Sequence, residues 1–220
     1  MGVFKKNKKT HSKILVIMKT KFITLITIAA LTLGKTSATF AANKGNEEIT
    51  TLTDIGHINA IEAKGNVEIY ITNGNKDGVK VFDNYYGKNA LVQTENGKLR
   101  ITSYNAEKLV VLVTVTDLRS IKAYNNAVIK SEGTLSALEL NVELNDNAGA
   151  QLKLDALAAN FKVEDSAKAD ISGIINDYEL NYSRSSSVNR TSLTAFNAYE
   201  NITTPIYTSL SGDNYSLARL

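Results

Sequence analysis

The chain has 220 residues, with 25 basic and 22 acidic side chains and a formal charge of +3. It contains no cysteine, which excludes a disulfide framework, a lipid anchor on cysteine and any cysteine-based metal site. A chain of this length can bury a sizeable core without covalent cross-links.

Residues 1–41 have the layout of a secretory signal peptide. Basic residues precede an apolar stretch at 22–33, and small residues follow it, so we expect cleavage after Ala41. The segment from Met18 is a complete leader by itself, which makes Met18 an alternative start. A retained membrane anchor is the competing interpretation, but an apolar stretch of about a dozen residues is too short to span a bilayer comfortably.

Loss of this leader reverses the sign of the net charge. The leader holds eight lysines and no acid, so the remaining chain carries 17 basic and 22 acidic residues, a net charge of −5. It lacks the basic footprint typical of nucleic-acid-binding proteins. We expect an exported domain over residues 42–202 in the periplasm, at the cell surface or outside the cell. It would have no nucleic-acid partner and no membrane span after cleavage.

The next part of the chain is predicted to be β-structure. Between Ile49 and Val115, short runs alternate apolar and polar residues, as half-buried strands do. The clearest runs cover residues 58–61, 67–71, 79–82, 99–102 and 109–115. Turn pairs such as Gly65-Asn66 and Asn96-Gly97 separate them.

A four-fold repeat follows. Each copy reads apolar, polar, apolar, two polar residues and a closing pair of small or amide side chains. The copies cover 121–127, 142–148, 161–167 and 180–186, so they are 21, 19 and 19 residues apart. A nearly fixed period of this length predicts an all-β solenoid, similar to a β-helix, with coils of about 19–21 residues. A β-sandwich is the alternative, which this regular spacing disfavours.

Alternation within the repeat assigns each residue to a face. The inward side chains are predicted to be Ile121, Ala123, Val142, Leu144, Phe161, Val163, Leu180 and Tyr182. The outward row between them is Lys122, Glu143, Lys162 and Asn181. Opposite charges on neighbouring strands contribute about 0.2–1 kcal/mol, so in-register stacking suits this order.

The Asn-Ala and Ser-Ala steps are the expected corners of the coils, because short polar side chains tolerate tight turns. Just before them stands the outward column Asn125, Asp146, Asp165 and Arg184. Two stacked aspartates could hold calcium, which takes about six to eight oxygens. We expect a solvated column in which Arg184 relieves the Asp146–Asp165 repulsion, and cation binding there stays open.

Two features end the chain. Residues 192–201 form the one modest helical candidate. Pro205 marks the change into a tail rich in Ser, Thr and Asn, which we expect to be loosely packed over residues 203–220.

Several segments resemble a known family. Residues 63–71, 79–81, 95–101 and 113–115, followed by the corner repeats, are similar to the bacterial head GIN domain family, often labelled autotransporter adhesins. The similarity covers roughly residues 51–200. It implies an exported β-solenoid with two sheets of short stacked strands, no catalytic residues and a role in adhesion.

No catalytic constellation is recognisable. His57 is the one histidine after the leader, and we expect it to be a turn or edge residue. A Gly-x-Ser-x-Gly elbow, a phosphate loop and a dinucleotide fingerprint are missing. We therefore predict no catalytic residue, no cofactor and no metal ligand, and the binding residues stay undefined.

Three functions remain open. The first is a non-catalytic envelope or surface module that binds an unknown protein or glycan through a rigid solenoid face. The second is a carbohydrate-active enzyme of polysaccharide lyase type on a β-helix. The third is an envelope protein that associates with copies of itself through exposed strand edges.

Overall fold

The computed structural model describes residues 49–52, 55–82, 90–104 and 106–203, which lie within the compact unit Glu47–Leu220. These ranges contain 13 strands and no helix, which confirms the all-β prediction. Accordingly, no helix long and apolar enough to cross a membrane occurs in them. The predicted signal peptide and the tail beyond Thr203 lie outside the described residues.

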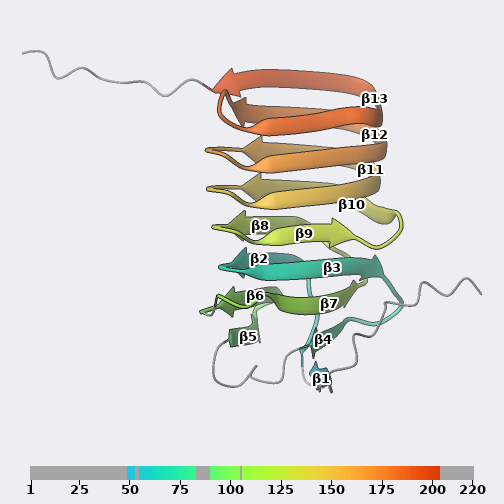
Figure 1. The fold of residues 1–220 in the computed structure, drawn as a ribbon. Helices are drawn as coiled ribbons and strands as arrows, with labels where there is room; N and C mark the ends of the chain where they lie inside the picture. Colours follow the sequence, from blue (N-terminus) through green and yellow to red (C-terminus); the bar gives the residue numbers. More distant parts are fainter. Residues whose placement is uncertain (1–48, 53–54, 83–89, 105, 204–220) are drawn as a thin grey trace, which may run out of the picture. The chain divides into compact units, whose positions relative to one another are not determined.

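All the strands belong to one sheet that curls on itself (Figure 1). Its strands are β1 (Ile49–Leu52), β2 (Ala60–Lys64), β3 (Val67–Asn73), β4 (Gly78–Phe82), β5 (Ala90–Glu95), β6 (Lys98–Ser103), β7 (Leu109–Val115), β8 (Ser120–Tyr124), β9 (Val128–Ser131), β10 (Leu135–Leu144), β11 (Gly149–Val163), β12 (Lys168–Ser183) and β13 (Ser187–Thr203).

The sheet has a front and a back part in Figure 1. Strands β3, β7 and β9 lie in front of β6, β2 and β8, and β11, β12 and β13 bend so that each contributes to both parts. The pairing agrees with this arrangement, because the first half of β11 pairs with β9 and the second half with β10. These pairs are parallel, whereas β1, β4 and β5 pair antiparallel with their neighbours.

The parallel registers place the sequence repeats side by side. Val142 lies opposite Ile121 in β8 and Phe161 in β11, and Phe161 lies opposite Leu180 in β12. All the predicted inward side chains are buried except Tyr182, which is half-buried.

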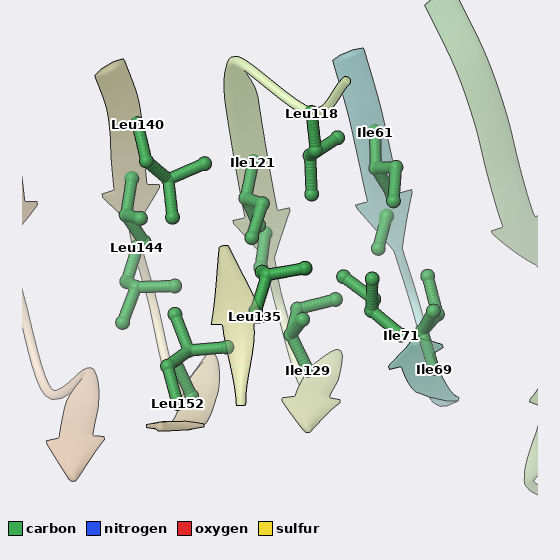
Figure 2. Packing of buried hydrophobic residues seen from close by; sticks show 14 of the residues in the cluster. Ile61, Ile69, Ile71, Leu118, Ile121, Ile129, Leu135, Leu140, Leu144 and Leu152 are labelled. Atoms are coloured by element: carbon green, nitrogen blue, oxygen red, sulfur yellow. The ribbon is translucent and has the colours of Figure 1, made fainter. Parts of the chain in front are cut away.

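The core is the row of apolar side chains between the front and back parts. Figure 2 shows Ile61, Ile121, Leu140 and Leu144 of the back strands together with Ile129 of the front. Each of these five side chains is at most 1% exposed. Full burial of one such side chain contributes about 1.5–3 kcal/mol, so columns of them account for much of the stability.

The helical candidate at residues 192–201 is wrong, since this segment is the middle of β13. Strand β12 pairs with β13 along nearly its whole length, from Lys168–Ser187 to Ser183–Thr203, with one register shift between Asp170 and Ser172. Buried backbone groups need such partners, and Thr, Phe and Tyr residues favour strands. Pairing with the edge of β12 therefore outweighs the weak helical preference of residues 192–201.

Candidate binding face

The outward side chains on the back part of the sheet form a polar surface that contains a groove. We call this surface, on β8 and the second halves of β10 to β13, the polar face. Its groove is lined by outward polar side chains at Ser120, Lys122, Asn141, Glu143, Asn160, Lys162, Asn181 and Thr203. Because strand residues alternate, each outward residue is flanked by the inward residues that anchor it to the core.

One row of the polar face is charged. Lys122, Glu143 and Lys162 lie opposite one another in register, as predicted. Lys122 Nζ lies 2.6 Å from Glu143 Oε2 on the neighbouring strand. Lys162 Nζ instead lies 3.1 Å from Oε2 of Glu164, two residues further along the chain. The hydrogen bond from Lys122 lowers the pKa of Glu143. Glu62 of β2 continues the row on the other side of Lys122, so the signs keep alternating.

Side-chain amides lie in two rows: Asn141 and Asn160 stand opposite each other in a second row, and Asn181 and Asn201 continue the row of Lys162. Asn160 donates to Asn141 Oδ1 at 3.0 Å, and Asn201 donates to Asn181 Oδ1 at 3.3 Å. These bonds fix the amides relative to one another and leave further donors and acceptors facing solvent. The sequence analysis missed the Asn141–Asn160 pair, although these two residues share the 19-residue spacing of the repeat.

Beside the groove lies a shallow hollow. It is lined by Ala158, Asn160, Asp177, Tyr178, Glu179, Asn197, Ala198 and Tyr199. Ala158 stands opposite Glu139 and Asp177, so its small side chain creates the depression between larger neighbours. Asn197 donates to Asp177 Oδ1 at 2.8 Å, and the ring of Tyr199 is 63% exposed at the rim. The hollow thus combines an aromatic surface with oriented carboxylate and amide groups.

Of the two tyrosines that line this hollow, Tyr199 is the exposed one. Tyr178 is buried in the core, Tyr124 is half-buried at the end of β8, and Tyr104 is exposed away from this hollow. Tyr85 and Tyr86 lie outside the described residues.

The aspartate carboxylates at the corners accept hydrogen bonds from backbone N–H groups. Asp146 Oδ2 accepts the N–H of Asn125 at 2.8 Å, and Asp165 Oδ2 accepts the N–H of Asp146 at 3.1 Å. Asn125, Asp146 and Asp165 have φ of 59°, 59° and 54°, the left-handed conformation that Asn and Asp tolerate. These residues, and not the Asn or Ser after them, make the turn.

The role expected of Arg184 is not found. In the described ranges, no ion pair joins Arg184 to Asp146 or Asp165, and no cluster of three or more potential metal ligands occurs. The carboxylates are stabilised by backbone N–H groups of the neighbouring corner, which replaces the guanidinium in offsetting their repulsion.

His57 is exposed in the segment before β2 and pairs with a partner that the sequence did not indicate. Its Nδ1 is 2.8 Å from Asp77 Oδ2, and the same nitrogen is 3.5 Å from Thr116 Oγ1. A catalytic triad needs the carboxylate and the nucleophile on opposite ring nitrogens. Burial would raise the pKa of Asp77, but the bonds from the backbone of Ile58, from His57 and from Thr116 lower it. This cluster therefore holds a loop in place.

A second charged cluster lies on the front part of the sheet. Glu68 is 7% exposed and receives hydrogen bonds from Lys108 at 2.7 Å, Lys130 at 2.6 Å and Tyr70 at 2.8 Å. Burial alone would raise the pKa of Glu68, but these three donors lower it to about 2. With its carboxylate saturated, Glu68 joins β3 to β9 and to the residue before β7.

The fold is similar to solved bacterial structures. One is described as a "putative lipid binding protein" from Parabacteroides distasonis, with 12% identity and a TM-score of 0.55. Two are described as a "putative adhesin", from Parabacteroides merdae with 16% identity and a TM-score of 0.53, and from Parabacteroides distasonis with 18% and 0.54. Each match covers 72% of this chain and 79% of the other. At such identities the likeness extends to the fold alone.

No curated protein matches the sequence. The resemblance to the head GIN domain family is confirmed by a family model described as "Putative auto-transporter adhesin, head GIN domain", which matches residues 57–205. The match spans more than half of the chain, and the chain belongs to this family.

Proposed function

We propose that this protein is an exported, non-catalytic adhesion module that binds a glycan of the cell envelope or of a surface through its polar face. Membership of an adhesin-like family and the adhesin neighbours support adhesion. The leader-like residues 1–41 support export.

The scaffold of this module is a β-solenoid with coils of about 19–21 residues after a cleaved signal peptide. Contacts between neighbouring coils support that period. The Asn141–Asn160 bond spans 19 residues, the Asn181–Asn201 bond 20 and the Lys122–Glu143 bond 21. A stack of this kind presents a rigid surface at little conformational cost, which favours binding of an extended ligand.

The hollow at Tyr199 is the observation that carries the glycan proposal. Sugars offer hydroxyl groups in several directions together with apolar C–H faces. Asp177 and Asn160 supply acceptors and donors, and the exposed Tyr199 ring supplies an amphipathic aromatic surface.

Glycan arrays followed by calorimetry with the 42–220 chain test the proposal. We expect Tyr199→Ala to weaken binding of the selected glycan about tenfold or more, equivalent to about 1.4 kcal/mol. Gln151→Ala is the matched control, because Gln151 is exposed on the front part of the sheet, away from the polar face.

Three outcomes would contradict the proposal. If the glycan arrays showed no binding and the chain captured an envelope protein, the ligand would be a protein. If the Tyr199→Ala and Gln151→Ala variants bound the selected glycan with equal affinity, the binding site would lie outside the hollow. Release of unsaturated oligosaccharides, followed by their ultraviolet absorbance as expected for conjugated products of a polysaccharide lyase, would restore the enzyme interpretation.

A further inference from the structure

Strand β13 forms one end of the sheet. Within the described ranges it pairs with β12 alone, which leaves the opposite edge of a 17-residue strand without a partner. A long unpaired edge is a template for another strand and so for a second copy of the same chain. The inward side chains of β13 decide whether this end can accept one.

Two of these inward positions carry opposite charges. On the back part, Val142, Phe161 and Leu180 are followed in the same column by Glu200. On the front part, the register shifts between Asp170 and Ser172, which places Arg190 level with the buried Ile171. Two of the apolar columns of the core thus end in an acid and a base, whereas others end in Val188, Leu193 and Ala195.

The two charges bind each other across the open end. Arg190 Nε lies 2.6 Å from Glu200 Oε1, and Arg190 Nη2 lies 2.7 Å from Glu200 Oε2. This is the two-point geometry of strong arginine–carboxylate pairs. The side chains are 41% and 29% exposed, so both remain in contact with water.

We propose that the Arg190–Glu200 pair and the adjoining register shift close this end of the stack against a second copy of the chain. Another strand added to β13 would take both charges out of water, and the desolvation of such a pair can exceed its attraction. Inward charges and bulges are also the means by which proteins protect sheet edges. The inference is independent of the ligand on the polar face.

Replacement of both charges by leucine tests this closure. We expect the 42–220 chain to sediment as a monomer and the Arg190→Leu/Glu200→Leu variant to form dimers or larger species whose fraction rises with concentration. Lys122→Leu/Glu143→Leu is the matched control, because it removes an equally close ion pair from the side of the stack. The exchanged pair Arg190→Glu/Glu200→Arg should stay monomeric.

Cysteine cross-linking shows where the copies meet, since the chain has no cysteine of its own. Ser192→Cys places an exposed thiol on β13, and Gln151→Cys places one on β11. In the leucine background, oxidation should link copies through position 192 and not through position 151.

The proposal fails if the unaltered chain already self-associates through position 192, if the folded leucine variant stays monomeric, or if the control pair associates equally. Circular dichroism establishes folding. If the leucine variant does not fold, Arg190→Gln/Glu200→Gln takes its place, and a monomer at every concentration would overturn the proposal.

Discussion

Alanines at the corners of the sheet have no room for a larger side chain. Ala127, Ala148 and Ala167 are fully buried, each two residues after a residue with a left-handed backbone. The Ala148 carbonyl accepts the N–H of Lys168, which ties the corner to the next level of the stack. Packing and hydrogen bonding therefore act at the same residue.

Ala148→Asp should lower the free energy of unfolding by about 3 kcal/mol or more, because it forces a carboxylate into a site without partners. Urea unfolding followed by circular dichroism measures this change. Asn147→Asp is the control, since it adds the same charge to the preceding, exposed residue. Equal stability of the two variants would show that the inward assignment of Ala148 is wrong.

At the scale of the strand, close contact between β11 and β12 requires a glycine. Gly173 lies opposite Leu154 with φ of 102°, and a Cβ added there would lie 2.0 Å from the Leu154 carbonyl oxygen. Gly173→Ala should therefore destabilise the protein by about 1–3 kcal/mol.

Gly149→Ala provides the opposite case. Its backbone is not left-handed, and an added Cβ would meet Val128 at 3.7 Å, an ordinary contact. This variant should be neutral or more stable by about 0.4–1 kcal/mol, because alanine reduces the entropy of the unfolded chain. Thermal melts of both variants test the pair of expectations. A Gly173→Ala variant as stable as Gly149→Ala would contradict the close approach of the two strands.

Much of the strand pattern was predictable because it is local. The alternation of Ile121, Lys122 and Ala123 determines which side chains turn inward, and the repeat spacing aligns Lys122 with Glu143. Strand β13 was not predictable in this way, since Thr194 to Tyr199 become a strand through the edge of β12. The hollow was missed for the same reason: Ala158 and Tyr199 are 41 positions apart in the printed sequence and meet only through the registers of β11, β12 and β13.

At the scale of the whole molecule, acid should loosen the part of the stack that Glu68 holds together. Its carboxylate bonds Lys130 of β9 and Lys108 before β7, so it connects three levels of the sheet. These bonds lower the pKa of Glu68 from 4.5 to about 2 in the folded chain, despite the opposing effect of burial. The unfolded chain therefore takes up the proton first. The stabilisation is complete above about pH 5 and is lost as the pH falls toward 2.

Glu68→Gln should make the protein less stable at pH 7 by up to about 3 kcal/mol and nearly equal to the unaltered chain at about pH 2. Guanidinium unfolding at intervals between these pH values measures the difference. Glu107→Gln, an exposed neighbour of Lys108, should leave the pH profile unchanged. A constant gap between Glu68→Gln and the unaltered chain at every pH would mean that shape, and not charge, makes Glu68 important. A gap that closes in acid would identify this carboxylate as the electrostatic link between β3, β7 and β9.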